Sequence, residues 1–499
     1  MQFSSLVRGV MEMLPQTFGP RMRETSPLNL AIALLLLLTV ALLAAIPESF
    51  ARNGIEPWSE NGWYWSYQGK PVLLIGGSDD DNLFQWPEAD LKAHLDKLAE
   101  AGGNVIRNTM SDRKDKGFEV YPFAQLQNGK YDLDQWNPEY WERFDRMLRE
   151  TAKRGIFVQI EVWDRFDYTD SGGSDRWWNH PYNPRNNVNY TYEESGFAER
   201  YPDHPGANRQ PFFYTVPALQ NNQTVLKYQQ AFARRMLESS LRYGHVLYCV
   251  DNETSGAEEW ARYWAEFIQE QARSRGKTVY ITEMWDEWDI TAAVHRRTYD
   301  HPELYGFVDV SQNNHVKGWA HWERLLKVRE YLQGHPRPIN NTKIYGADGN
   351  RFGDTNQDAV ERFWRILLAG CASARFHRPD SGLGLNDLAV ASLRSARAVE
   401  SRIPFWKLTP RAERLLPPEQ GNAWMGAAPG EGAVVFIPRQ QPQPEVTVDL
   451  SDLGLKRNVS IQWINVKTGD ARAPEPLGSA GGPVTLRCPD AGNWVAVIR

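Results

Sequence analysis

The chain has 499 residues, enough for one large domain and a smaller one. Apolar residues make up 41% of it and the formal net charge is −6, which excludes a disordered chain and a basic nucleic-acid-binding face. Trp, Tyr and Phe each occur 20 times, although Trp is normally the rarest of the three.

The first 51 residues differ in composition from the rest. Arginines precede an apolar run over Leu30–Ile46 that only Thr39 interrupts, and Ser49-Phe50-Ala51 then places small residues where a signal peptidase reads them. We expect residues 1–51 to be a signal peptide or, because the run only just suffices to cross a bilayer, an uncleaved anchor. Either predicts export: periplasmic, extracellular, or membrane-anchored facing outward.

Residues 52–410 alternate between short apolar runs and helical patterns. The predicted strands are Pro71–Ile75, Asn104–Asn108, Ile156–Trp163, Val246–Val250, Thr278–Thr282, Phe307–Val310, Arg337–Asn341 and Ala372–His377. The predicted helices include Glu88–Ala101, Pro138–Arg154, Val225–Tyr243, Glu258–Arg275, Trp319–Gln333 and Thr355–Ala369. Strands buried on both faces and separated by helices predict an α/β fold, a (β/α)₈ TIM barrel. A doubly wound sheet is the alternative, but its glycine-rich phosphate turn is replaced by an acidic one, Gly76–Asp81.

The segment Arg165–Asn222 interrupts this rhythm, with many aromatic residues among Asn, Pro and Asp. Long segments of this kind inside a domain are usually functional or disordered, and the aromatic content argues against disorder. Because it follows a strand, we expect it to form a wall of a binding cleft. Aromatic rings in such a wall suit sugar rings, which have apolar faces and polar edges.

The short run Tyr248–Glu253 ends a predicted strand with Asn252-Glu253. Carboxyl ends of barrel strands carry the active sites of this fold. A glutamate there can donate a proton in glycoside cleavage, and an asparagine can bind a sugar hydroxyl.

Residues 411–499 consist of short β-rich runs separated by Gly, Pro and Asp, which predicts a small C-terminal β-sandwich. We expect this domain mainly to pack against the barrel; independent ligand binding is the alternative.

The sequence contains no His-Glu-x-x-His, Cys-x-x-Cys or Gly-x-Ser-x-Gly motif, and we expect no metal and no organic cofactor. Cys249 and Cys371 are interpreted as small core residues.

The strand ends, in order, resemble those of the retaining glycoside hydrolases with (β/α)₈ barrels, in particular cellulase-like and apiosidase-like bacterial proteins with a small C-terminal β domain. Gly103–Arg107 resembles the second strand, whose arginine supports the catalytic carboxylate. Asn252-Glu253 resembles the fourth-strand Asn-Glu pair, in which Glu is the acid/base. Asp309–His315 and Arg337–Lys343 resemble the sixth and seventh strands.

The seventh strand departs from this pattern, because Lys343 stands where the resemblance implies a nucleophilic glutamate. Another acid replaces it, the register differs, or the barrel no longer cleaves glycosides. Glu283, at the end of the fifth strand, is the first candidate replacement, followed by Asp164 and Asp348. Lys343 would lower the pKa of a neighbouring carboxylate or bind an acidic sugar.

The sequence therefore predicts an exported glycoside hydrolase. Glu253 would protonate the leaving oxygen, which requires a raised pKa, and Glu283 would act as nucleophile or base. The residues expected to position the sugar are Arg107, Trp163, Asp164, Asn252, Trp285, His315 and Lys343. The expected partner is a carbohydrate, with no nucleic acid and no obligate protein partner. Rival hypotheses are a glycan-binding barrel that has lost its nucleophile and a scaffold protein.

Overall fold

The computed structural model describes residues 54–499 apart from residues 112–115, 417–422, 441, 456–457 and 480. The predicted signal peptide or anchor, residues 1–51, lies outside the described residues, so both interpretations stay predictions. Within the described part, every helix is too short or too polar to cross a membrane.

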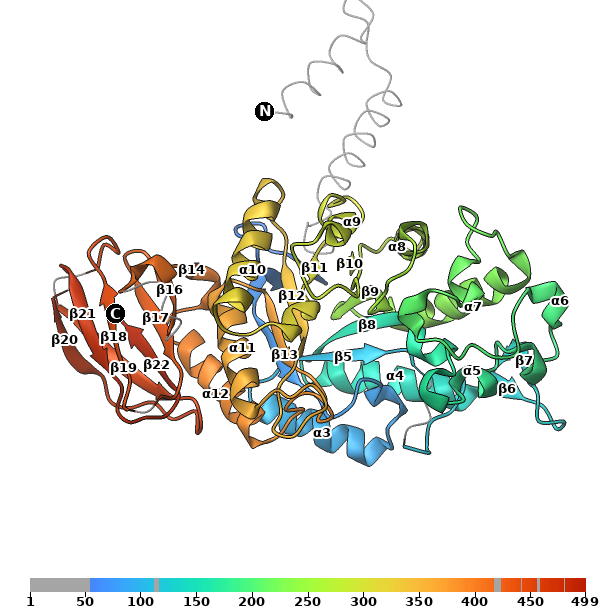
Figure 1. The fold of residues 1–499 in the computed structure, drawn as a ribbon, viewed down its shortest axis with the longest axis horizontal. Coiled ribbons are helices and arrows are strands. Elements are labelled where there is room, and N and C mark those ends of the chain that lie inside the picture. Colours follow the sequence, from blue (N-terminus) through green and yellow to red (C-terminus); the bar gives the residue numbers. More distant parts are fainter. Residues whose placement is uncertain (1–53, 112–115, 417–422, 441, 456–457, 480) are drawn as a thin grey trace, which may run out of the picture. The chain divides into compact units, whose positions relative to one another are not determined.

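Eight parallel strands form the central sheet (Figure 1). In chain order they are β4 (Leu74–Gly77), β5 (Val105–Thr109), β8 (Phe157–Asp164), β9 (Val246–Asn252), β10 (Ile281–Thr282), β11 (Val308–Asp309), β12 (Ile339–Ile344) and β13 (Ser373–Phe376). Their order in the sheet is β10-β9-β8-β5-β4-β13-β12-β11, so the first strand pairs with the last and only the β10/β11 seam lacks a ladder among the described residues. The predicted TIM barrel is confirmed.

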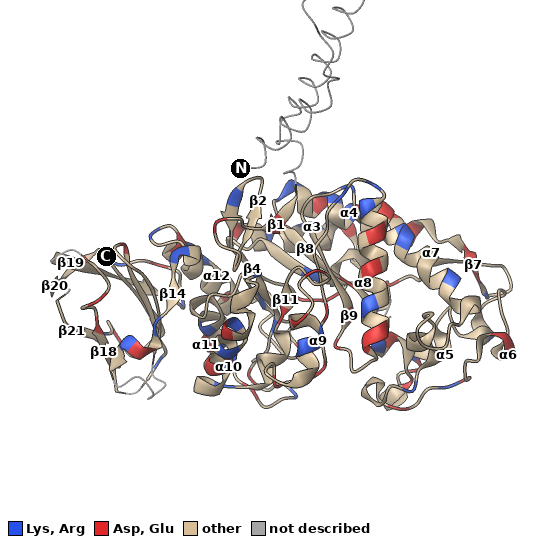
Figure 2. Ribbon diagram, turned by 90° about the horizontal axis from the view of Figure 1, so that it is seen from above, with Lys and Arg blue, Asp and Glu red and all other residues tan. Residues whose placement is uncertain are grey.

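Helices follow the strands and cover the outside of the sheet. They are α3 (Glu88–Glu100), α4 (Pro138–Lys153), α7 (Gln223–Ser240), α8 (Glu258–Arg273), α9 (Arg296–Tyr299), α10 (Gly318–Tyr331), α11 (Asn356–Leu368) and α12 (Asp387–Glu400). Along α8, Trp260, Trp264 and Ile268 are buried at helical spacing, while acidic and basic residues occupy the other face (Figure 2). The expected start of α11 is confirmed, since Thr355 caps it in a capping box with Asp358.

The first predicted strand is partly wrong. Pro71 belongs to β3 (Lys70–Val72), which joins β1 (Ile55–Pro57) and β2 (Trp65–Tyr67) in a separate antiparallel sheet, and the barrel strand β4 runs on to Gly77. Proline lacks the backbone donor that an interior barrel strand needs, so the apolar run divides after it.

The segment from Arg165 to Asn222 packs as an aromatic cluster of its own. It contains short helical turns, among them α5 (Arg176–Asn179) and α6 (Tyr192–Ser195), and it lies near the hairpin of β6 (Phe123–Gln125) and β7 (Tyr131–Trp136). Trp177, Tyr182 and Phe212 are at most 2% exposed. The prediction that these rings form sugar platforms is therefore wrong: most of them stabilise the segment itself by packing on each other.

The C-terminal region forms two antiparallel sheets around a core of its own, so the predicted β-sandwich architecture is confirmed. The larger sheet contains β14 (Thr409–Pro410), β16 (Trp424–Ala428), β17 (Gly432–Ile437), β19 (Asn458–Asn465), β20 (Glu475–Ser479) and β22 (Trp494–Ile498). The smaller sheet contains β15 (Leu415–Leu416), β18 (Glu445–Asp449) and β21 (Pro483–Arg487). The larger sheet packs on the barrel through Trp364 of α11, whose ring stacks on Phe436 at 5.6 Å.

Candidate active site

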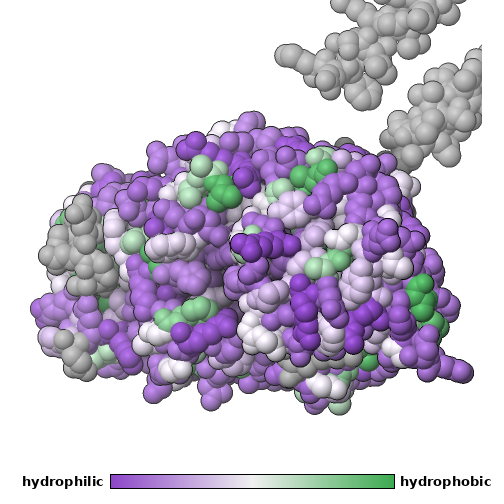
Figure 3. Space-filling view, turned by 45° about the vertical axis from the view of Figure 1, so that its right-hand side comes forward, coloured by the Kyte–Doolittle hydropathy of each residue, from purple (hydrophilic) through white to green (hydrophobic). Residues whose placement is uncertain are grey.

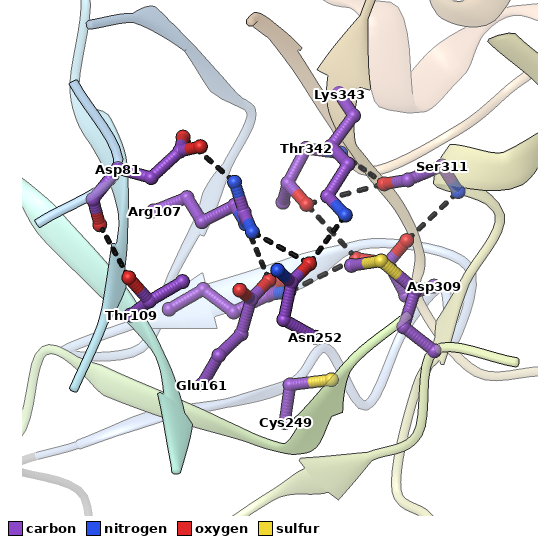
Figure 4. Close-up of polar contacts among 12 residues, drawn as sticks. Asp81, Arg107, Thr109, Glu161, Cys249, Asn252, Asp309, Ser311, Thr342 and Lys343 are labelled. Carbon is purple, nitrogen blue, oxygen red and sulfur yellow. Dashed lines mark hydrogen bonds and ion pairs between the residues drawn. The ribbon is translucent and has the colours of Figure 1, made fainter. Parts of the chain in front are cut away.

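Arg107 lies at the centre of a buried polar network at the carboxyl ends of the strands (Figure 4). Its Nη1 lies 2.7 Å from Asp81 Oδ1 and its Nε donates to Glu161 Oε1 at 2.5 Å. Its Nη2 donates to Asn252 Oδ1 at 2.8 Å. Burial opposes ionisation of Asp81, but Arg107 and other neighbouring cations hold the pKa of that carboxyl well below its usual range. Arg107 thus links the loop after β4 with β8 and β9, and its direct contact is with Asn252 rather than Glu253.

Lys343 and Glu253 form an ion pair beside this network. Lys343 Nζ donates to Glu253 Oε1 at 2.6 Å and to Asn252 Oδ1 at 2.5 Å. The Lys343 side chain is 2% exposed and that of Glu253 is 17% exposed, so the glutamate keeps access to solvent. Lys343 therefore lies at the end of the seventh strand, as the predicted register has it, and its ammonium contacts the glutamate of the fourth strand.

A bulge in β12 explains how Lys343 reaches this position. The pairing of β12 with β13 shifts register between Asn341 and Ile344. Bulges re-aim side chains, and here consecutive residues both point inward (Figure 4). Thr342 Oγ1 donates to Asp309 Oδ2 at 3.1 Å, while Lys343 reaches Glu253.

Glu253 has an unusual backbone and a shifted pKa. Its φ of 54° lies in the left-handed region, which costs a non-glycine residue roughly 1–2 kcal/mol. Burial alone would raise the pKa of Glu253, but the charge and hydrogen bond of Lys343 outweigh burial and hold that pKa at about 2. The sequence-based expectation of a raised pKa is therefore wrong, because Lys343 favours the ionised form.

Asp164 contacts the same asparagine from the third strand. Its Oδ2 accepts a hydrogen bond from Asn252 Nδ2 at 2.9 Å, and its Oδ1 accepts from the backbone N–H of Phe166 at 3.0 Å. Asn252 is thus held between Asp164 on one side and Arg107 and Lys343 on the other. Asp164 serves to orient Asn252.

Glu283 is not placed to attack a substrate, which corrects its interpretation as the second catalytic carboxylate. It is 1% exposed, and its Oε1 accepts from the backbone N–H groups of Asp251 and Met284 at 3.0 and 2.8 Å. Burial, together with the nearby Asp251, raises the pKa of Glu283 well above its usual range. Burial also raises the pKa of Asp251 to about 7. The two acids form a buried pair outside the reach of a ligand.

Trp163 and Trp285 are likewise buried rather than exposed to a ligand, so their predicted role as sugar-positioning residues is wrong. Each is 1% exposed. Trp163 packs among Phe232 and Trp264 of the outer helices. Trp285 donates its indole N–H to Thr298 Oγ1 at 2.8 Å.

An aromatic group accompanies His315 at the surface. The His315 ring lies 5.5 Å from that of Tyr345, and Tyr345 stacks between Phe352 at 5.0 Å and His377 at 5.1 Å. Phe352 is 39% exposed. Burial lowers the pKa of His315, although the Glu253 charge opposes this. His315 is thus placed where a ligand at Glu253 could touch it.

Asp286 was missed by sequence reasoning. It is exposed, its backbone N–H donates to Thr254 O at 2.8 Å, and its Oδ2 accepts from Ser255 Oγ at 3.4 Å. Partial removal from water, and then the Glu253 charge, raise the pKa of Asp286. Its position just after the fifth strand is the sequence feature that could have identified Asp286 as a candidate. Within the described residues no group of three or more His, Cys, Asp or Glu side chains could hold a metal ion.

Comparisons with known proteins bear on the fold. Residues 122–298 match the model of a domain of unknown function, DUF6298. Curated protein sequences give no match. A glycoside hydrolase family 5 structure from Bacteroides vulgatus ATCC 8482 has a TM-score of 0.57 and 12% identity, covering 90% of this chain and 94% of its own. A putative glycoside hydrolase from the same strain has a TM-score of 0.58 and 12% identity, covering 90% and 82%. The chain shares the barrel fold of these glycoside hydrolases.

Proposed function

We propose that this protein is an exported glycoside hydrolase that acts through Glu253 at the carboxyl end of the barrel. The observation that carries the proposal is the Lys343–Glu253 ion pair at 2.6 Å, on a glutamate with a strained backbone and partial exposure. Strained residues persist where the surrounding structure fixes them, and they cluster at functional sites. The barrel fold, shared with glycoside hydrolases, is the supporting context.

Lys343 changes the role that the resemblance implies for Glu253. With a pKa of about 2, Glu253 is ionised at neutral pH and cannot donate a proton. An ionised carboxylate at this place can take a proton from water or attack the anomeric carbon. We infer that Glu253 is the base or nucleophile of the reaction, which is the role the clan gives to its seventh-strand glutamate.

Asp286 is the proton donor that this role requires. It lies beside Glu253, because its backbone N–H and its side chain contact Thr254 and Ser255, the two residues that follow Glu253, and its pKa is raised while that of Glu253 is lowered, as in an acid/base pair. In the reaction, Asp286 would give its proton to the leaving oxygen as the glycosidic bond breaks. Glu253 would accept the proton of the attacking water in an inverting reaction, or bond to the anomeric carbon in a retaining one. The anomeric configuration of the first product distinguishes these two routes.

A second candidate function follows from the same ion pair. An ammonium where the clan carries a carboxylate also fits a barrel that binds glycans without cleaving them. Such a protein would hold an oligosaccharide against His315 and Phe352 and release no new reducing ends.

The experiment that separates these functions is a screen of plant and bacterial polysaccharides for new reducing ends. The variants are E253Q and D286N, with E259Q on the exposed side of α8 as the matched control. We expect E253Q and D286N to lower turnover about 10²–10⁴-fold and E259Q to leave it unchanged. Normal turnover in E253Q would refute the proposal. Binding without turnover by the wild type would establish the second candidate.

A further inference from the structure

Glu253 lies between two neighbours along the chain that are both fixed. Before it, Asn252 ends β9 and is hydrogen-bonded through both its amide nitrogen and its amide oxygen. After it, Thr254 is 1% exposed and donates its backbone N–H to Met284 O at 2.8 Å. A single residue between two fixed ones has little freedom, so these contacts impose the left-handed φ of 54° on Glu253.

Thr254 also fixes Asp286. The backbone N–H of Asp286 donates to Thr254 O at 2.8 Å, and Thr254 forms an isolated β-bridge with Trp285. The relative placement of Glu253 and Asp286 therefore depends on Thr254, which follows the first of them and is hydrogen-bonded to the second.

The side chain of Thr254 is fixed in turn by Arg165, the first residue after β8. Arg165 Nη1 donates to Thr254 Oγ1 at 3.0 Å, and the same oxygen accepts the backbone N–H of Gly256 at 3.0 Å. A Cβ at residue 256 would lie 2.7 Å from Arg165 Nη1, so the guanidinium occupies space that a side chain there would need. The turn from Glu253 to Gly256 is thus built around this guanidinium.

Stability alone does not explain the burial of Arg165. Charged side chains normally lie at the surface, which is mainly hydrophilic in the view of Figure 3, but Arg165 is 1% exposed. Its Nε and Nη2 have no hydrogen-bond partner among the residues that the structure describes, and burial lowers the pKa of Arg165 although Asp251 opposes this. The guanidinium lies 4.6 Å from the centre of the Phe213 ring, where an apolar side chain could pack without the cost of burying a charge. The hydrogen bond to Thr254 is what an apolar side chain could not supply.

We propose that Arg165 and Thr254 are positioning residues for Glu253. Together they keep Glu253 in its left-handed conformation, which brings its carboxylate to 2.6 Å from the Lys343 ammonium. They also set the spacing between Glu253 and Asp286, on which the course of the reaction depends. Only this second statement rests on the proposed function.

A double-mutant cycle in urea unfolding at neutral pH tests the first statement without a substrate. T254V replaces the hydroxyl with a methyl group, which releases Glu253 from Lys343. K343M should therefore lower the unfolding midpoint of T254V by less than half as much as it lowers that of the wild type. R165M should reduce the effect of K343M in the same way.

The matched control is T151V, which removes a buried hydroxyl from α4. Thr151 Oγ1 donates to Met147 O at 2.9 Å and lies 3.0 Å from His245 Nε2. K343M should lower the midpoint of T151V by the full wild-type amount. A threonine that serves only stability would give this additive result, so the control separates a positioning role from a structural one.

Turnover of a polysaccharide that the wild type degrades tests the second statement. We expect T254V to lower kcat about 10²-fold and to leave KM nearly unchanged, because a catalytic group misplaced by about 1 Å loses about that factor. T254S keeps the hydroxyl and should restore most of the loss, while T151V should match the wild type.

Several results would overturn the proposal. An effect of K343M that is as large in T254V or in R165M as in the wild type would remove the residue replaced from the positioning role, and T254V decides alone where R165M does not fold. A wild-type midpoint that K343M leaves unchanged would show that no ion pair is being held. Wild-type kcat in T254V would refute the second statement. An inactive wild type with a coupled cycle would refute the hydrolase proposal alone, and an active one with an additive cycle would refute only the positioning role.

Discussion

Replacing Lys343 with methionine tests the ion pair on which the account depends. The change removes the ammonium and keeps most of the aliphatic chain. The pKa of Glu253 is about 2 in the folded protein, against an ordinary value of 4.5. One pKa unit corresponds to about 1.4 kcal/mol, so this shift is worth about 3 kcal/mol at neutral pH. Because 17% of the Glu253 side chain is exposed, we expect a loss of about 2–3 kcal/mol in K343M.

The loss depends on pH in a defined direction. A lowered carboxyl pKa contributes stability above the unfolded-state value of 4.5, and that contribution disappears as the pH falls toward about 2. In K343M Glu253 lacks its nearest cation, so its pKa rises and its ionisation at pH 7 costs stability relative to the wild type. Protonation in mild acid relieves this cost. The difference in free energy of unfolding between wild type and K343M is therefore largest at neutral pH and becomes smaller toward about pH 3.5.

Urea unfolding of both proteins at neutral and acidic pH measures this gap. The matched control is K407M, which breaks the exposed Lys407–Glu431 pair and should cost about 1 kcal/mol or less. A gap of the same size at both pH values would refute the reasoning, as would a K343M protein no less stable than K407M.

Three further variants test the buried groups. R107M removes the ion-pair partner of Glu161 and one of the three guanidinium groups around Asp81, and should lower the free energy of unfolding by about 3–5 kcal/mol; a loss below about 1 kcal/mol would contradict the buried network. E283Q should unfold at the same or higher urea concentration at pH 7, because the raised pKa of Glu283 makes the folded protein hold a proton that the unfolded chain releases above pH 4.5. Its turnover should be normal, and a severe loss would restore Glu283 as a catalytic group. W285F should keep wild-type glycan affinity in a titration, because the indole is 1% exposed; weaker binding would place it in the site.

Much of the fold could be predicted from the sequence because buried parallel strands are continuous apolar runs. The strands that carry Arg107, Asn252 and Lys343 were predicted with carboxyl ends within three residues of the observed ones, and Thr355 marked a helix start. The division of the first run at Pro71 was missed, since both halves are apolar. The strands β10 and β11 are two residues long, which is too short for the sequence pattern to define where they begin and end.

Side-chain direction near the strand ends could not be predicted. Strict alternation would place Glu161 and Trp163 on the same side of β8, yet Glu161 contacts Arg107 and Trp163 packs on outer helices. Asp164 then faces inward, toward Asn252. The bulge in β12 likewise turns Lys343 inward next to Thr342, and such bulges have no reliable sequence signal.

The sequence also could not show which acidic residue after the fifth strand lies at the surface. Glu283 and Asp286 both follow the fifth strand, and the sequence gives no reason to prefer one. The backbone N–H groups of Asp251 and Met284 hold Glu283 inside, which leaves Asp286 at the surface. The burial of Glu283 and the exposure of Asp286 thus depend on contacts between neighbouring strand ends, which form only in the closed barrel.

The pH dependence of kcat/KM for wild type and K343M, on a polysaccharide that the wild type degrades, tests the central claim most directly. A base held ionised by Lys343 predicts that wild-type activity does not fall around pH 4.5 on the acid side, since the pKa of Glu253 is about 2. In K343M the loss of the ammonium raises that pKa, so activity should begin to fall on the acid side at a higher pH than in the wild type. A wild-type acid limb near pH 4.5 that K343M leaves in place would contradict the account.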